Sequence, residues 1–309
     1  MRISILGTGA IGSLFAASLA ADPANEVLCV TYSPEHSDCI NEKGITIHEK
    51  DGSLTHAENL RAVTDTSGEN PAELVIVLVK SYSTREAVKS HPQIFGPDTT
   101  VLTLQNGYGN HLPLLETADA SQILLGTTAH GMNIRDDGEI IHAGSGVTTI
   151  GALEPDGSGT EERLKKTAEV LDRAGFQTVI SDDVFDAIFR KLFVNTAINA
   201  LCALNDKPNK YIVSDPQMNR RSRRLVGEAV ETVNAGGRSY DPDKIIEDAM
   251  HVAELTGENI CSMLADVRRR RPTEIRAING AIVAMAEENG MDAPLNREIV
   301  NEIEERFPF

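Results

Sequence analysis

The sequence predicts an α/β protein, in which an N-terminal Rossmann-type dinucleotide-binding domain precedes a C-terminal all-helical domain. A glycine-rich turn directly follows the first apolar strand, and short apolar runs then alternate with helical patterns up to about residue 182. From residue 183 onward the strand patterns disappear and long helical patterns follow. Continuous apolar runs are typical of parallel strands that are buried on both faces. We therefore expect a dinucleotide-binding domain at residues 1–182 and a helical substrate and catalytic domain at residues 183–309.

The chain begins with a strand at residues 3–6 and a glycine-rich turn, in the sequence MRISILGTGAIG. Its three glycines have the GxGxxG spacing. The first glycine permits the tight turn, the second lets the backbone approach a pyrophosphate, and the third lets the helix pack on the strand. The following helix N-terminus would face the phosphates, although a purely structural turn is the alternative. The expected cofactor-binding residues here are Gly7, Thr8, Gly9, Ala10, Ile11 and Gly12.

Further strands and helices are predicted in order along the first domain. The apolar runs predict buried parallel strands at residues 26–31, 74–79, 100–104 and 123–126. Turn signals between residues 136 and 146 separate β-rich segments, and we expect these to add antiparallel strands to the parallel sheet. A last strand is predicted at residues 176–180.

The end of the second strand usually distinguishes the two nicotinamide cofactors. The absence of an acidic group at Thr31 and Tyr32 favours NADPH, with the hydroxyls of Thr31 and Ser33 as phosphate donors, whereas Glu35 favours NADH. Lys80 ends the strand LVIVLVK and is placed to reach the cofactor, although a lysine at a strand end is also commonly a solvated residue. The expected cofactor is NADPH, with NADH as the alternative.

Composition excludes several functional classes. The net charge of −17 opposes non-specific binding to nucleic acid or to an anionic membrane surface. The four cysteines form no CxxC pair and, with the eight histidines, show no zinc spacing, so we expect reduced thiols and no metal. Neither a signal peptide nor a membrane span is predicted. We therefore expect a cytoplasmic protein that binds neither nucleic acid nor membrane.

A polar stripe interrupts the apolar segment VFDAIFRKLFVNTAINALCAL at residues 184–204, which predicts a helix buried within the protein. Lys191, Asn195 and Asn199 are spaced i, i+4, i+8 and share one helical face. In one interpretation the lysine pairs with a carboxylate and the asparagines satisfy backbone groups. We favour catalysis, because a buried ammonium is costly and a lysine with a lowered pKa can exchange a proton near neutral pH.

A second polar set lies further along the chain. Asn259, Ser262 and Asp266 are spaced i, i+3, i+7, which predicts one helical face. Pro272 suits the first position of the next helix, which would place Glu274 in its first turn. Stabilisation of the helix dipole is the alternative to a functional role for this glutamate.

Asn106 stands at the carboxyl end of the predicted strand VLTLQNG. Ligands bind at this edge of open α/β sheets, so Asn106 is a candidate ligand contact. An Asn-Gly pair is also a common turn sequence, and a structural role is an equal alternative.

Together these motifs resemble the ketopantoate reductase (2-dehydropantoate 2-reductase) family over nearly the full length. The resemblance is carried by GTGAIG, LVKSYST, LQNGYGN, GTTAHG, IHAGSGVTTIG, FRKLFVNTAINAL, ENICSMLADV and RPTEIRAINGAIV. It implies an NAD(P)H-dependent oxidoreductase that reduces ketopantoate to (R)-pantoate in pantothenate biosynthesis. The alternatives are a related 2-oxo or 3-hydroxy acid dehydrogenase with another substrate, and a non-catalytic nicotinamide sensor, which the intact polar stripe disfavours.

The resemblance also implies roles for individual residues. Lys191 corresponds to the family's catalytic lysine, and Glu274 corresponds to its active-site glutamate, which would also contact the cofactor. Family members often carry an arginine after the second strand for the cofactor's 2′-phosphate, and Tyr32 and Ser33 stand there instead, so the resemblance leaves the preference for NADPH open. The implied partners are a small 2-oxo acid and a second copy of the chain in a homodimer. The implied substrate-binding residues are Asn106, which would also contact the nicotinamide, Asn195, Asn199, Asn259 and Ser262, with Asn209 at a further polar position.

Overall fold

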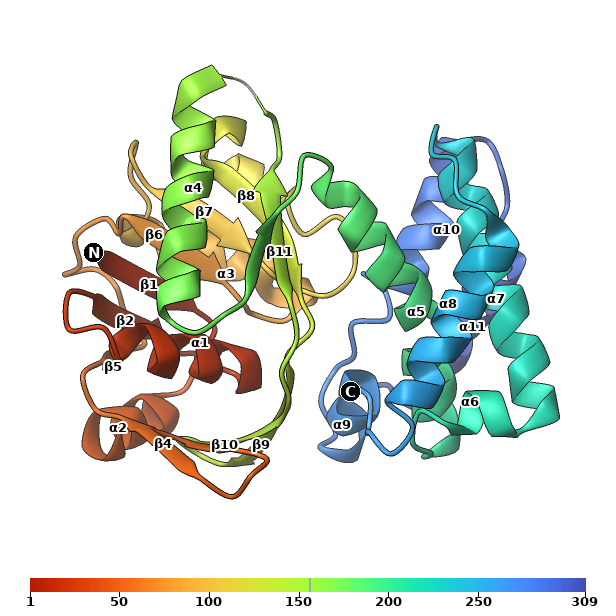
Figure 1. Cartoon of the computed structure of the whole chain (residues 1–309), viewed down its shortest axis with the longest axis horizontal. Helices are drawn as coiled ribbons and strands as arrows, with labels where there is room; N and C mark the ends of the chain where they lie inside the picture. Colours follow the sequence, from red (N-terminus) through yellow and green to blue (C-terminus); the bar gives the residue numbers. More distant parts are fainter. Residues whose placement is uncertain (156) are drawn as a thin grey trace. The chain divides into compact units, whose positions relative to one another are not determined.

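The computed structural model describes residues 1–155 and 157–309, and the chain divides into two compact units (Figure 1). Unit 1 comprises Met1–Gln105 and Asn110–Ala187, and unit 2 comprises Asn106–Gly109 and Ile188–Phe309. The division falls within the long helix α5 (Val184–Asn205). The short segment Asn106–Gly109 therefore packs with the helical unit, although the chain on either side of it belongs to the sheet unit.

Unit 1 is built on an eight-stranded sheet with the order β12-β11-β8-β7-β6-β1-β2-β5. From β5 to β8 all neighbouring strands are parallel, whereas β11 runs antiparallel to β8. The order β5-β2-β1-β6-β7-β8 is that of a Rossmann-type sheet, which confirms the predicted fold class. The strands are β1 (Arg2–Leu6), β2 (Glu26–Val30), β5 (Arg61–Val63), β6 (Leu74–Val77), β7 (Thr100–Thr103), β8 (Ile123–Thr128), β11 (Thr148–Ala152) and β12 (Thr178–Ile180).

A second, four-stranded sheet was not predicted. Its order is β4-β3-β10-β9, from β3 (Ile45–His48), β4 (Leu54–Ala57), β9 (Gly131–Asp136) and β10 (Glu139–Gly144). The expectation that the β-rich segments around residues 136–146 would all add antiparallel strands to the parallel sheet is therefore wrong, because β11 does so whereas β9 and β10 join the second sheet. The reason is long-range pairing: β10 pairs with β3, a strand of four residues whose sequence alone gives a weak signal.

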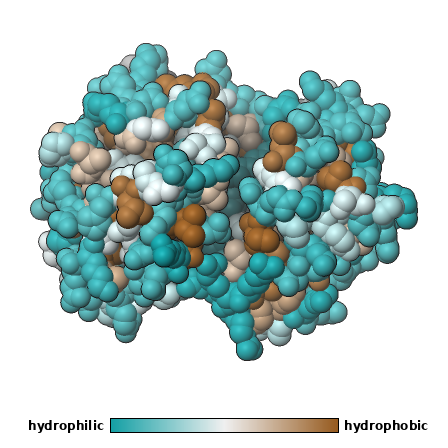
Figure 2. Space-filling view, turned by 60° about the horizontal axis from the view of Figure 1, so that its bottom comes forward, coloured by the Kyte–Doolittle hydropathy of each residue, from teal (hydrophilic) through white to brown (hydrophobic). Residues whose placement is uncertain are grey.

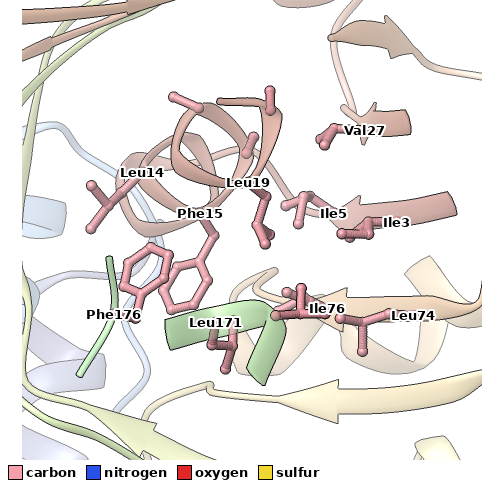
Figure 3. Packing of buried hydrophobic residues seen from close by; sticks show 14 of the residues in the cluster. Ile3, Ile5, Leu14, Phe15, Leu19, Val27, Leu74, Ile76, Leu171 and Phe176 are labelled. Atoms are coloured by element: carbon pink, nitrogen blue, oxygen red, sulfur yellow. The ribbon is translucent and has the colours of Figure 1, made fainter. Parts of the chain in front are cut away.

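Helices cover the sheets and complete the core of unit 1. Helix α1 contacts β1 and β2 of the large sheet as well as β3, β9 and β10 of the small one. Figure 3 shows Phe15 of α1 against Phe176, and their rings stack with centroids 4.1 Å apart. Burying a large apolar side chain contributes roughly 1.5–3 kcal/mol, so this core fixes α1 firmly on β1. The helices of this unit are α1 (Ala10–Ala20), α2 (Pro34–Lys43), α3 (Thr84–Ser90) and α4 (Gly157–Arg173), with short 3-10 helices η1 (Ser81–Ser83), η2 (Pro92–Ile94), η3 (Leu114–Glu116) and η4 (Ala120–Gln122).

Unit 2 is helical, and an Asp-Pro pair marks the start of both α7 (Pro216–Ala235) and α8 (Pro242–Leu255). Asp215 accepts hydrogen bonds from two backbone amides at the start of α7, and Asp241 does the same for α8. Such caps satisfy amides that have no partner within the helix. The helices are α5, α6 (Tyr211–Ser214), α7 (Pro216–Ala235), α8 (Pro242–Leu255), α9 (Ser262–Arg268), α10 (Asn279–Glu288) and α11 (Pro294–Arg306).

Helix α5 is the core helix of the chain. By length and composition it would pass as a membrane span, and 67% of its most apolar window is buried inside the structure. The predicted buried helix at residues 184–204 is therefore confirmed. By contrast, the face of the molecule in Figure 2 is mostly hydrophilic with scattered apolar groups, as expected for a chain with 24% charged residues.

Candidate active site

The glycine turn joins β1 to α1 at the point where the strand order reverses. Gly7 has a φ of +102°, and a Cβ at this position would lie 2.5 Å from the amide nitrogen of Val79. A Cβ at Gly12 would lie 2.0 Å from the carbonyl oxygen of Gly7. At Gly9, by contrast, a Cβ would meet nothing within 4 Å. Gly7 and Gly12 therefore allow close packing, whereas Gly9 leaves open space at the start of α1.

The groups around this open space suit an anionic ligand. Among the residues that the structure describes, no side chain caps α1, so its first amides point toward the turn without a side-chain acceptor. The hydroxyl of Thr8 is buried and has no hydrogen-bond partner among residues 1–155 and 157–309. Helix N-termini bind phosphates through such amides and the helix dipole. The residues present therefore fit the pyrophosphate of a dinucleotide.

His36 is a neighbour of this turn that the sequence analysis missed. Its Nε2 lies 3.0 Å from the carbonyl oxygen of Thr8, and its Nδ1 lies 3.3 Å from a carboxylate oxygen of Asp137. Because a carbonyl oxygen only accepts, Nε2 carries the hydrogen in this contact. The imidazole thus joins α2 to the glycine turn. The only signal for this contact in the sequence is the place of the histidine, in the first turn of the helix that follows the second strand.

The end of β2 holds the groups that were considered for cofactor choice. The hydroxyl of Thr31 donates to the carbonyl oxygen of Ser33 at 3.1 Å. The hydroxyl of Ser33 donates to the carboxylate of Glu35 at 2.5 Å, which lowers the pKa of that carboxyl. Tyr32 is 88% exposed. Both hydroxyls that were expected to donate to a phosphate therefore donate to protein oxygens here.

Lys80 follows β6, the strand beside β1, and is half-buried at the start of η1. Because parallel strands end at the same sheet edge, this places Lys80 on the same edge as the glycine turn. Val79, the residue before it, is the one that approaches Gly7.

The polar stripe lies on α5 as predicted. Lys191 and Asn195 are half-buried, and Asn199 is only 3% exposed. Burial lowers the pKa of Lys191 from its ordinary value of 10.5 to about 8, and the negative charge of Glu274 opposes this shift. The amide nitrogen of Asn199 is buried and has no hydrogen-bond partner in the described part of the chain. The stripe therefore offers a desolvated amine and an unused amide donor.

Glu274 is buried, with 6% of its surface exposed, but it does not lie in the first turn of a helix. Helix α10 begins at Asn279, and residues 274–278 form a turn in which the amides of Ala277 and Ile278 donate to the Glu274 carbonyl oxygen at 3.0 and 3.1 Å. Ile278 has φ −103° and ψ −88°, which interrupts helical geometry before α10. The expected helix start at Pro272 is therefore wrong.

Asn106 lies next to this turn within unit 2. Gly107 has a φ of +89°, and a Cβ there would lie 2.3 Å from the carbonyl oxygen of Ala277. The amide of Tyr108 donates to the same oxygen at 2.8 Å. The Asn-Gly pair therefore does form a turn, and that turn holds Asn106 close to the segment that carries Glu274.

Asn259 does not share a helical face with Ser262 and Asp266. It lies in the connection between α8 and α9, where its carbonyl oxygen accepts from the amide of Asn209 at 3.0 Å. The chain turns at Gly257, whose amide bonds back to α8, so the helix cannot continue to Asn259. Asn259 and Ser262 are exposed, whereas Asp266 is buried.

Two further asparagines of unit 2 are buried. The side chain of Asn209 is buried and donates to the hydroxyl of Thr256 at 3.0 Å. Asn279, which the sequence analysis did not single out, is fully buried between helices.

No group of three or more His, Cys, Asp or Glu side chains suited to a metal ion occurs within residues 1–155 and 157–309.

A Rossmann-type unit with a dinucleotide-binding turn, followed by a helical unit with a desolvated lysine and a buried glutamate, defines a nicotinamide-dependent oxidoreductase. Residues 3–155 match the family model described as ketopantoate reductase PanE/ApbA, and residues 183–306 match the model for its C-terminal part. The chain therefore belongs to the ketopantoate reductase family, as the sequence motifs predicted.

Relatives of known name agree with this membership. The 2-dehydropantoate 2-reductase of Halobacterium salinarum is 33% identical over 302 residues, which cover 97% of each chain. The enzyme of the same name from Pyrococcus abyssi is 35% identical over 296 residues, which cover 96% of this chain and 94% of the relative.

Solved structures also match over the whole chain. A ternary structure of D-mandelate dehydrogenase with NADH and anilino(oxo)acetate matches with a TM-score of 0.93 at 26% identity, covering 100% of this chain and 99% of that one. The 2-dehydropantoate 2-reductase of Geobacter metallireducens matches with a TM-score of 0.90 at 25% identity, covering 99% and 100%. Family and structural neighbours thus support a nicotinamide dinucleotide as the cofactor and a small oxo acid as the class of substrate.

Proposed function

We propose that this protein reduces 2-dehydropantoate to pantoate with NADPH, and that Lys191 is the proton donor. The observation that carries the proposal is the desolvated amine of Lys191, which interacts with the charge of Glu274. Lys191 lies on α5, the helix that also carries Asn195 and Asn199. Full-length relatives named 2-dehydropantoate 2-reductase support the choice of substrate.

The glycine turn of unit 1 would hold the cofactor. The helix amides after Gly9 and the buried hydroxyl of Thr8 would bind the pyrophosphate, with Lys80 at the same sheet edge. When bound, the reduced nicotinamide supplies a hydride to the substrate carbonyl carbon. The further residues proposed to contact the cofactor are Gly7, Ala10, Ile11, Gly12, Asn106 and Glu274.

Lys191 is suited to donate the proton that the developing alkoxide needs. An acid with a pKa of about 8 is still mostly protonated at neutral pH and gives up its proton more readily than an ordinary lysine. The charge of Glu274 keeps this pKa from falling further, so the amine stays in its acidic form. Lys191 and Glu274 are therefore the proposed catalytic pair.

Amide and hydroxyl groups of unit 2 would orient the substrate. The unused amide of Asn199 is a donor for a carboxylate or hydroxyl oxygen. Donors aimed at the oxygen that becomes negative stabilise the transition state more than the ketone. The proposed substrate-binding residues are Asn106, Asn195, Asn199, Asn259 and Ser262.

Cofactor preference is a separate part of the proposal. The absence of an acid at Thr31 and Tyr32 supports NADPH, whereas the carboxylate of Glu35 in the first turn of α2 favours NADH. Comparing kcat/KM with NADPH and NADH decides between them. A higher value with NADH would overturn the NADPH assignment and leave the reaction unchanged.

A related oxo acid is the second candidate substrate, because the structural match to D-mandelate dehydrogenase is as extensive as the match to 2-dehydropantoate 2-reductases. Activity should be measured with 2-dehydropantoate and with 2-oxo acids that carry linear, branched or aromatic side chains. The highest kcat/KM for 2-dehydropantoate supports the proposal, and a higher value for an aromatic 2-oxo acid selects the second candidate.

The proton-donor role is tested by Lys191→Ala, with the fold checked by circular dichroism. We expect a loss of about a hundredfold or more in kcat, in the range of general acid catalysis. Turnover within a few-fold of the wild type would refute the role.

We also propose a cytoplasmic homodimer with domains at residues 1–182 and 183–309. We further propose that it binds neither nucleic acid nor membrane, which the acidic net charge of −17 supports.

A further inference from the structure

Asn279 is the first residue of α10 and is 0% exposed. It directly follows residues 274–278, whose backbone is closed by the two hydrogen bonds from Ala277 and Ile278 to the Glu274 carbonyl oxygen. The position of Asn279 is therefore fixed relative to Glu274 through a short, hydrogen-bonded stretch of chain.

The carboxamide of Asn279 also reaches helix α5. Its Nδ2 donates to the carbonyl oxygen of Thr196 at 2.9 Å and to Oδ1 of Asn296 at 2.9 Å, so both amide hydrogens are used. Thr196 lies on the same helix as Lys191. One side chain thus connects the helix that carries the lysine with the turn that carries the glutamate.

The far end of this contact is itself anchored. Asn296 is fully buried, and its backbone amide and Nδ2 donate to Glu228 Oε1 at 2.7 and 2.8 Å. The amide of Leu295 donates to the other carboxylate oxygen of Glu228 at 2.9 Å. A carboxylate at the start of α11 is favoured by the helix dipole. Asn279 is therefore held rigidly and cannot turn away from Thr196 without breaking a buried network.

We propose that Asn279 is a positioning residue for Lys191 and Glu274, because its carboxamide holds α5 at a fixed distance from the turn that carries the glutamate. The proposal rests on the catalytic pair proposed above. A buried amide of this kind also stabilises a helical core, so its loss is expected to lower the melting temperature in any case. The Coulomb interaction between two charges weakens as their separation grows. A change in the distance between Lys191 and Glu274 is therefore expected to alter the pKa of the lysine as well as the stability of the protein.

The test is Asn279→Leu, which keeps the bulk of the side chain and removes the amide. Glu274 raises the pKa of Lys191, so a looser contact is expected to lower that pKa. We expect a decrease of about half a unit or more, and a loss of about tenfold in kcat with a smaller change in KM. The pKa is measured by NMR titration of isotope-labelled lysine side chains in the protein without substrate, with the Lys191 signal assigned from Lys191→Arg.

Asp215→Ala is the matched control, because it removes the side-chain cap at the start of α7 and has no part in the hydrogen bonds that join Asn279, Thr196 and Asn296. A shift in the Lys191 pKa in Asn279→Leu but not in Asp215→Ala, at a similar loss of melting temperature, supports the proposal. An unchanged pKa in Asn279→Leu, or an equal shift in the control, overturns it. If Asn279→Leu does not fold, Asn279→Ser is read in the same way.

Failure of the proposed function is distinguishable from failure of this inference. It would show as a Lys191→Ala protein that keeps its turnover, whereas the titration needs neither substrate nor turnover.

Discussion

Glu274 and Lys191 act on each other electrostatically: burial lowers the pKa of the lysine to about 8, and the charge of the glutamate limits that decrease. The two residues are separated by most of the helical unit in sequence. The balance between desolvation and one negative charge therefore sets the acidity of the amine, and each contribution can be changed separately by substitution.

Removal of the charge of Glu274 should make Lys191 more acidic. Glu274→Gln keeps the shape of the side chain, so the pKa of Lys191 is expected to fall below about 8 and the alkaline decline of kcat/KM to move to lower pH. The measurement is kcat/KM between about pH 6 and 10. Glu287→Gln, which changes an exposed carboxylate paired with Arg297, is the control and should leave the profile in place. An identical profile in Glu274→Gln would exclude the electrostatic role.

Lys191 should reduce the stability of the protein. Its pKa of about 8 lies below the ordinary 10.5, so the unfolded chain binds the proton more tightly; the cost is full below about pH 8 and is lost as pH rises toward 10.5. Lys191→Met is therefore expected to raise the free energy of unfolding at pH near 7 by on the order of 1–3 kcal/mol, with a smaller gain at about pH 10.

Denaturant unfolding at the two pH values measures this effect. Lys244→Met changes an exposed lysine in the same unit and should alter stability by less than about 0.5 kcal/mol. A Lys191→Met protein that is less stable than the wild type at neutral pH would contradict the account of desolvation.

The glycine turn offers a pair of substitutions that separates packing from binding. A Cβ at Gly12 would collide with the Gly7 carbonyl oxygen at 2.0 Å, so Gly12→Ala should lower the free energy of unfolding by about 2 kcal/mol or more. A Cβ at Gly9 has nothing within 4 Å, so Gly9→Ala should fold normally but bind NADPH about tenfold or more weakly. Calorimetric titration and melting temperatures measure both, and wild-type affinity in Gly9→Ala would argue against cofactor binding at this turn.

The parts of the fold that depend on residues close together in sequence were predicted correctly. The strand, the glycine turn and α1 follow one another directly, and the polar stripe of α5 follows from helical spacing alone. The strands β3 and β4 were missed because each has only four residues, and the hairpin they form is held in its sheet by β10, which pairs with β3 and lies about ninety residues further on.

The same limit explains the errors in the site. Asn259 and Glu274 were assigned to helices by spacing, but Gly257 and the geometry of Ile278 place both in turns. His36 and Asn279 were missed because their partners, Thr8 and Thr196, are 28 and 83 residues away in sequence. Spacing reveals neighbours on one helix and gives no signal for contacts between elements.

The most direct test of Lys191 as the proton donor is the pH dependence of oxo acid reduction by the wild type and by Lys191→Arg, measured side by side. An arginine keeps the positive charge but does not release a proton in this range. The account predicts that the wild type loses activity as pH rises through about 8, and that Lys191→Arg is at least about a hundredfold slower with no such decline. A Lys191→Arg protein that keeps the wild-type rate and the same alkaline decline would contradict it.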